Sequence, residues 1–422
     1  VLFLAAPTGQ TPHAVAHFSK ATSLGPDAAV YWRNLGVAQF SLDQIQFAAQ
    51  SLQAALNLSP GECPSMIALA QVYEAWRRPD DAEVLARRCL EANISDGRAA
   101  GYLIRLQVAQ NHFDEAMKTA STFADELSDP SAVMAELHLM MNQPEKALAV
   151  LADVGQPSFQ SAMALAMSGS PYQALQQARE VRASGDPGAE VALSEAALSF
   201  ATGEVVDPEL RSVLEADPEL RASLAWFDAL ALASSQGADA AADAARGADN
   251  MLPGVRFDGV PESDWATLSG DVNRSKAALA MLWLLRGYDM SARAAFQGLQ
   301  ENEAIQQARY FAALADVRLN DLEKAQERLL LVSDAAPRYY SAQILLGEVQ
   351  LNLGRAAEAL ASYSKAVEVV EDGGALMKIG LLADYLDKPT VAEDALRRFI
   401  ALFPDSFIGY NQLAWVFVQR ET

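Results

Sequence analysis

Alanines recur at a fixed spacing along the first part of the chain, and this recurrence limits the fold more than any other feature. The series is Ala14, Ala48, Ala82 and Ala116, in which each residue number exceeds the one before it by 34. A period of this length is typical of small helical units that stack on one another, because one unit cannot bury its apolar stripe alone. We therefore expect an array of repeats and no single large core.

The same period returns later in the chain. The residue numbers of Ala292, Ala325, Ala359 and Ala392 increase by 33, then 34, then 33. Between the two runs the interval shortens, to 31 from Ala116 to Ala147 and to 27 from there to Ala174. These intervals predict two regular arrays joined by degenerate units.

Each regular unit places small, bulky and helix-ending residues in a fixed order. In residues 29–62 these are Trp32, Leu35, Gly36, Ala48, Leu52, Ala55 and Pro60. In residues 340–372 they are Leu346, Gly347, Gly354, Ala359, Tyr363 and Ala366. Small residues let two antiparallel helices approach, bulky residues interdigitate with the next unit, and proline ends the second helix because it has no amide hydrogen.

This pattern resembles the tetratricopeptide repeat. The resemblance implies an all-α fold, a right-handed superhelical solenoid of stacked antiparallel helix pairs. We expect an N-terminal array in residues 1–185, a degenerate helical segment in 186–249, a loop or hinge in 250–264, and a C-terminal array in 265–422 that stops within a repeat. The Gly- and Pro-rich segment 250–264 is typical of either a bending or docking loop or a plain connector.

Composition narrows the range of partners. The 54 acidic and 32 basic residues give a formal net charge of -22, which repels phosphate backbones, so nucleic acid is not an expected ligand. No apolar run is long enough to span a bilayer.

The sequence offers little material for catalysis. It contains no phosphate-binding loop, nucleophile elbow, zinc-protease or calcium-loop motif, and it has only four histidines and two cysteines. His13 and His17 lie one helical turn apart on a predicted helix, but no third metal ligand accompanies them. We therefore interpret the protein as non-enzymatic and assign no catalytic residue, no cofactor and no metal.

The two cysteines belong to one unit. Cys63 opens its first helix and Cys89 lies near the end of its second, so the antiparallel course of the pair brings them close. A Cys63–Cys89 disulfide is therefore possible and would imply an oxidising compartment. The alternative is that Cys89 is a free, buried thiol in a position where the repeat requires a small residue.

The resemblance also implies a binding groove, lined by the first helices of successive units. In the N-terminal array the groove residues are Arg33, Asn34, Gln71, Arg98, Tyr102 and Arg105. In the C-terminal array they are Tyr310, Phe311, Ile344, Glu348 and Lys378. The first set suits a peptide carboxylate, because guanidinium donates two parallel hydrogen bonds. The second suits an amphipathic helix or an apolar peptide, unless these side chains pack between units.

Three interpretations of function follow. The preferred one is a scaffold or adaptor that binds protein or peptide partners along the groove, within a larger assembly. A second is a periplasmic component of an envelope machine, because the repeats in 340–422, which end in Asn411–Trp415, loosely resemble those of exopolysaccharide export proteins. A third is the noncatalytic arm of a larger enzyme. The compartment stays open between periplasm and cytoplasm, with the periplasm preferred, and the oligomeric state is not predicted.

Overall fold

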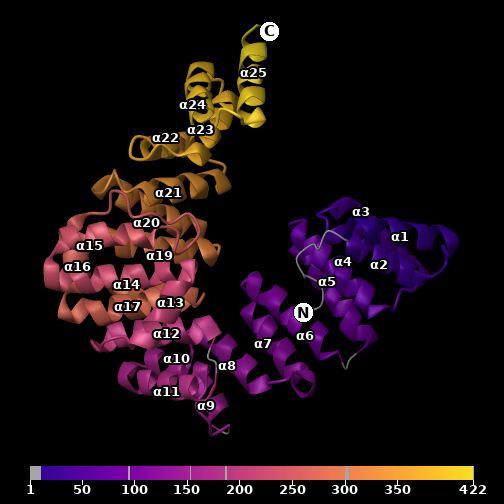
Figure 1. The fold of residues 1–422 in the computed structure, drawn as a ribbon, viewed down its shortest axis with the longest axis horizontal. Helices are drawn as coiled ribbons and strands as arrows, with labels where there is room; N and C mark the ends of the chain where they lie inside the picture. The colour runs from indigo at the N-terminus through magenta and orange to yellow at the C-terminus, as the bar shows by residue number, and fades with distance from the viewer. Residues whose placement is uncertain (1–10, 94–95, 153, 186–187, 300–303, 422) are drawn as a thin grey trace. The chain divides into compact units, whose positions relative to one another are not determined.

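The computed structural model describes residues 11–93, 96–152, 154–185, 188–299 and 304–421, and every regular element within these ranges is a helix. The chain forms two compact units that divide between Leu137 and His138 (Figure 1). The expected fold class is confirmed, because the helices pair antiparallel and the pairs stack. No described helix combines the length and the apolar character needed to cross a membrane.

The first unit contains three successive helix pairs, and each pair packs on the next. The helix α1 (Thr11–Leu24) precedes the pairs α2 (Ala29–Phe40) with α3 (Ile45–Leu58), α4 (Cys63–Ala75) with α5 (Pro79–Ala92), and α6 (Gly97–Ala109) with α7 (Phe113–Thr122). A short 3-10 helix η1 (Ala124–Glu126) follows, and α8 (Pro130–Met140) crosses the division between the units.

The second unit begins with α9 (Pro144–Leu151), α10 (Phe159–Met167), α11 (Pro171–Ala183) and α12 (Gly188–Thr202). The chain then forms α13 (Pro208–Ala216), α14 (Pro218–Gln236), α15 (Ala238–Ala245), the 3-10 helix η2 (Arg246–Ala248) and α16 (Glu262–Ser269). Helix α12 packs against both α11 and α17, so the stack continues from α12 to α17 while α13 to α16 lie beside it.

Regular pairing resumes at α17 and continues to the last described helix. The elements are α17 (Asp271–Leu285), α18 (Asp289–Gly298), α19 (Gln306–Arg318), α20 (Leu322–Ala335), α21 (Tyr340–Asn352), α22 (Ala356–Val367), α23 (Gly373–Tyr385), α24 (Pro389–Leu402) and α25 (Phe407–Glu421). Each helix in this series packs on the next one along the chain.

The period in the sequence comes from the close approach of the two helices of each pair. A Cβ atom built on Gly36 would lie 2.6 Å from Cγ of Leu52, and one on Gly347 would lie 2.7 Å from the Tyr363 ring. The alanines that set the period, such as Ala48 and Ala359, are fully buried. Only small residues therefore fit where the backbones meet.

Several pairs share a buried polar contact between their two helices. Ser51 donates to the side-chain oxygen of Gln39 at 2.7 Å, and Ser362 donates to that of Gln350 at 2.7 Å. Thr119 makes the same contact with Gln107 at 3.0 Å. In each case the hydroxyl residue lies 12 positions after the glutamine. The contact gives the side-chain oxygen of each glutamine a hydrogen-bond partner between the two helices.

The turn within each pair also repeats. One residue there adopts a left-handed backbone, with φ of 58° at Asp43, 60° at Asn111, 60° at Asn320 and 74° at Gly354. Asp, Asn and Gly tolerate this conformation best. Arg77 is the exception, with φ of 59°.

The segment 250–264 is fixed to the helices that follow it. The amide of Arg256 donates to Oγ of Ser341 at 2.7 Å, and the amide of Tyr340 donates to the carbonyl of Asp258 at 3.0 Å. A Cβ on Gly259 would lie 1.6 Å from the carbonyl oxygen of Arg338, so a larger residue does not fit. These contacts attach the segment to the start of α21 and to the turn before it.

The carboxylate of Asp264 on α16 caps the start of α19, although the two helices are not consecutive in the sequence. The amide of Gln307 donates to its carboxylate at 2.5 Å, and the Asp264 residue is 3% exposed. Burial raises the pKa of this carboxyl from its ordinary 3.8 to about 6, although the amides of Gln307 and Gln306 oppose the shift.

We expect Gly36→Ala to destabilise the first unit by about 1–3 kcal/mol, because the added methyl group overlaps Leu52. Gly101→Ala in α6 is the matched control, since no heavy atom lies within 4 Å of its Cβ position. It should leave stability unchanged or raise it. Urea unfolding followed by circular dichroism measures both. Equal midpoints for the two variants would contradict the close approach.

Asp264 should make the stability of the second unit depend on pH. Between pH 3.8 and about 6 the folded state holds a proton that the unfolded state has lost, so stability falls as the pH rises through this window. In the Asp264→Asn variant the side chain does not titrate, so this contribution to the pH dependence is absent. The stability of the wild type relative to this variant, from urea unfolding at several pH values, should therefore decrease toward pH 6. An increase would mean that the two amides outweigh burial.

Candidate functional site

The predicted groove residues of the first unit lie on α2, α4 and α6, but two of the three arginines have partners within the chain. Arg33 forms an ion pair with Glu62. Arg105 donates to both carboxylate oxygens of Glu74, at 2.8 and 2.9 Å, and the Tyr102 hydroxyl donates to the same carboxylate at 3.1 Å. These cations already face an anion.

The cluster around Glu74 is electrostatically coupled. The hydrogen bond from Arg105 lowers the pKa of Glu74, although partial burial opposes it. Burial raises the pKa of Tyr102, and the adjacent Glu74 carboxylate raises it further. The guanidinium of Arg105 also lies 4.9 Å from the centre of the Tyr102 ring. The arrangement joins α4 to α6, and it leaves little of the positive charge of Arg105 available to a ligand.

The other residues of the polar set remain accessible. Arg98 and Gln71 are exposed, and Asn34 is half-buried. Arg98 has no ion pair among the residues that the structure describes. The three arginines are thus not equivalent, and Arg98 is the one whose charge is available.

Two residues of the C-terminal set lie in the core. Tyr310 is 2% exposed and Phe311 is 0% exposed. The Phe311 ring packs 5.3 Å from that of Phe296 and 6.5 Å from that of Trp226, which α14 contributes. Tyr310 packs 5.0 Å from Tyr339. The alternative of packing between units therefore holds for this pair, and neither offers surface to a partner.

The remaining residues of that set lie nearer the surface. Ile344 is half-buried against the core of the last pairs. Lys378 donates to Glu348 at 2.7 Å, and its ammonium nitrogen lies 5.2 Å from the centre of the Tyr363 ring. This ion pair joins α21 to α23.

The structure shows an exposed apolar surface that the sequence analysis did not identify. It lies on α23 and α25, which contact each other, and we call it the C-terminal apolar face. Its residues and exposed fractions are Leu381 45%, Tyr385 79%, Ile408 48%, Trp415 55% and Val418 52%. Leu381 and Trp415 are one repeat period apart and occupy equivalent positions. Extending the groove positions by one period would have found them.

Two clusters of possible metal ligands occur among the described residues. One consists of Glu83, His112 and Glu115, but Arg87 hydrogen-bonds to both glutamates and supplies the positive charge there. His13 and His17 are exposed and belong to neither cluster.

The other cluster is Cys63, Cys89 and Asp96. The two sulfur atoms are joined in the structure, with Cα atoms 4.7 Å apart, which lies in the usual disulfide range of about 4.4–6.8 Å. The bridge connects the start of α4 to the end of α5, as the antiparallel course of the pair requires.

The bridge should form in solution and stabilise the first unit by about 2–4 kcal/mol, because it constrains the unfolded chain. Peptide mapping without reductant should recover the Cys63 and Cys89 peptides as one linked species. Reductant should lower the melting temperature of the wild type and leave that of the Cys63→Ala/Cys89→Ala variant unchanged. Free thiols in protein purified under oxidising conditions would contradict the pairing.

Comparison with known proteins supports the repeat type. Residues 310–374 match the family model of the tetratricopeptide repeat. These residues are α19 to α22 with the start of α23, where the pairing is most regular. A comparison with curated protein sequences finds no significant match.

The chain is also similar, at low identity, to several solved structures. The Cut9–Hcn1 hetero-tetramer of the APC/C is 14% identical, with 97% of this chain and 93% of that chain covered and a TM-score of 0.38. Yeast Tom70 is 14% identical, with 98% and 93% covered and a TM-score of 0.33. Naa15/Naa10 bound to HypK-THB is 14% identical, with 92% and 66% covered and a TM-score of 0.32. These likenesses are too distant to bear on function.

Proposed function

We propose that this protein is a non-enzymatic scaffold that binds an amphipathic helical segment of a partner protein on its C-terminal apolar face. The observation that carries the proposal is the exposure of large apolar side chains on neighbouring first helices, namely α23 and α25. A contiguous apolar patch of this kind is typical of a protein interaction site. The tetratricopeptide match in residues 310–374, immediately before it, supports the scaffold class.

The spacing of the exposed residues indicates the shape of the ligand. The exposed Leu381 and Tyr385 lie four residues apart on one face of α23, and the half-buried Met377 precedes them at the same interval. A second stripe on α25 includes Ile408, Trp415 and Val418. Two neighbouring apolar stripes suit an amphipathic helix, which can cover both with its own apolar face.

The net charge of this chain indicates which residues should flank the apolar face of the partner segment. The chain carries a formal net charge of -22, so the polar side of the partner segment should be basic. Rim charges of this kind speed association and add little affinity, while the aromatic Trp415 and Tyr385 supply the main contact area.

Membership of a larger assembly follows from the same proposal, since a scaffold holds more than one partner. A periplasmic location is the second candidate, favoured by the joined sulfur atoms of Cys63 and Cys89, because such bonds persist in oxidising compartments. If the complex with the partner formed only under non-reducing conditions, partner binding and an oxidising location would be linked.

Leu381→Asp should abolish capture of the partner by the full chain without unfolding it, because the change puts a carboxylate at the centre of the apolar face. The matched control is Leu402→Asp on α24, the second helix of the same pair. Leu402 is 40% exposed, against 45% for Leu381.

Pull-down from native extract, with binders quantified by mass spectrometry for the wild type and both variants, measures the effect. The partner should be a protein lost with Leu381→Asp and retained with Leu402→Asp. Capture that is equal in all three proteins would refute this face as the binding site. Melting curves by circular dichroism confirm that each variant is folded.

A further inference from the structure

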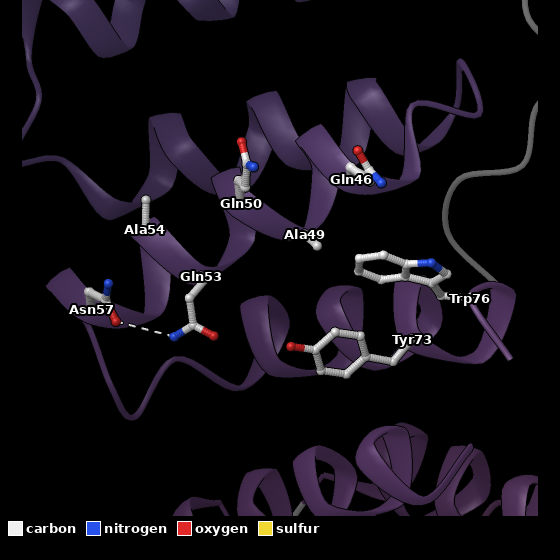
Figure 2. A pocket seen from close by; sticks show the side chains of 8 residues that line it. All are labelled: Gln46, Ala49, Gln50, Gln53, Ala54, Asn57, Tyr73 and Trp76. Atoms are coloured by element: carbon white, nitrogen blue, oxygen red, sulfur yellow. Dashed lines mark hydrogen bonds between the residues drawn. The ribbon is translucent and has the colours of Figure 1, made fainter. Parts of the chain in front are cut away.

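A cleft of about 430 Å³ lies between α3 and α4 in the first unit (Figure 2). The residues that line it are Gln46, Ala49, Gln50, Gln53, Ala54, Asn57, Tyr73 and Trp76. None of them carries a charge, although the chain as a whole is strongly acidic. The cleft thus differs in character from the ion-paired surface around Glu74 and from the C-terminal apolar face.

One wall of the cleft is a stripe of amides. Gln46, Gln50, Gln53 and Asn57 follow one another at intervals of four, three and four, so they share one face of α3. All four are exposed, and Gln53 donates to Asn57 at 3.1 Å. Each amide offers two donors and one acceptor, so the stripe can both give and receive hydrogen bonds along its length.

The repeat itself does not require this stripe. The equivalent positions on α5, one period later, are Asp80, Val84, Arg87 and Glu91. Those on α24 are Thr390, Asp394, Arg397 and Ala401. These two second helices therefore carry ordinary mixed, charged surfaces at these positions, and the run of amides belongs to this cleft alone among the three helices compared.

The opposite wall is aromatic. Figure 2 shows the rings of Tyr73 and Trp76 close together at the end of α4, with Ala49 of α3 near Trp76, whereas the amides of Gln46 and Gln50 point away from the rings in this view. Trp76 is 40% exposed, and the Arg78 guanidinium lies 4.8 Å from the centre of the Tyr73 ring and 5.9 Å from that of Trp76. Arg78 is held in turn by Asp81 at 2.7 Å. The rings are thus fixed in place before a ligand arrives, which lowers the cost of binding.

We infer that this cleft binds a neutral oligosaccharide. Sugar hydroxyls donate and accept hydrogen bonds, as the amides of the stripe do. The weakly positive C–H groups on the face of a sugar ring pack against the negative face of an aromatic ring. A cleft of this size, with aromatic walls and a few convergent polar groups, is typical of a small-ligand site.

Two other ligand classes fit less well. Nucleic acid and charged glycans find no cation among the lining residues and meet a chain of net charge -22. An amphipathic helical peptide needs a continuous apolar surface, whereas Ala49 and Ala54 are the only aliphatic residues among the described ones that line the cleft. A ring-shaped polar ligand needs no such surface.

Isothermal titration calorimetry of the full chain tests the inference. The probes are neutral hexasaccharides of glucose, mannose, galactose and N-acetylglucosamine, together with a proline-rich decapeptide. At least one hexasaccharide should bind saturably. Trp76→Ala and Gln50→Ala should each weaken that binding by about tenfold or more, because each removes a direct contact.

Phe47→Ala is the matched control. Phe47 lies on α3 beside the stripe, is 60% exposed and does not line the cleft, so its loss should leave binding unchanged. The inference is overturned if none of the hexasaccharides binds, if Trp76→Ala binds as well as the wild type, or if only the peptide binds. Circular dichroism melts show whether Trp76→Ala is folded, and Gln50→Ala tests the site independently of the aromatic ring. None of these outcomes bears on the C-terminal apolar face, which lies in the other unit.

Discussion

The close approach of two helices at glycine and alanine is the contact on which the rest of the structure depends. A Cβ atom added to Gly36, Gly347 or Gly380 would lie 2.6 to 2.7 Å from the bulky residue of the partner helix. At that separation Leu52, Tyr363 and Leu396 are held against the neighbouring backbone and become fully buried. Stacking of successive pairs then buries what a single pair leaves exposed, so stability accumulates from neighbour to neighbour.

Ion pairs also connect neighbouring repeats, and they decide which charged side chains are available to a ligand. Ion pairs connect successive units at similar separations, including Arg33 with Glu62, Arg105 with Glu74, Arg355 with Glu323 and Lys378 with Glu348. Exposed pairs of this kind contribute about 0–1 kcal/mol each. Their larger effect is on recognition, because each of these basic residues is already matched by an acidic one. Of the basic residues predicted for the groove, Arg33, Arg105 and Lys378 are therefore neutralised within the chain, and Arg98 is not neutralised by any of the described residues.

Much of the fold could be predicted from the sequence because the repeat is set by small residues at fixed spacing. The positions of Gly36, Ala48, Gly347 and Ala359 are enough to indicate the pairing. The left-handed turn residues carry an equally regular signal, since Asp43, Arg77 and Asn111 are each one period apart, but the side chains there are too varied to notice as a motif. The predicted domain limits at residues 186, 250 and 265 remain predictions.

The site was harder to predict than the fold, because helices far away in the sequence can cover the positions predicted to line the groove. Tyr310 and Phe311 were predicted to line the groove, yet both are buried: Trp226 from α14 packs on Phe311, and Tyr339 packs on Tyr310. Helix α14 belongs to the irregular part of the chain, where the period fails. Trp226 also donates a hydrogen bond to Gln307 on α19, a residue far away in the sequence. The spacing of the repeats cannot predict a contact between residues so far apart in the sequence.

The surfaces that remain open are those where side chains depart from what the repeat requires. Packing demands small residues at the helix crossing and bulky ones beside it, but it makes no demand for amides on α3 or for exposed tryptophan on α25. Apolar groups that stay exposed to water do not stabilise the fold, because they contribute to folding only when they are buried. The exposed parts of Trp415, at 55%, and Trp76, at 40%, therefore add nothing to the stack itself. The two proposed ligands would give both residues a role that folding does not.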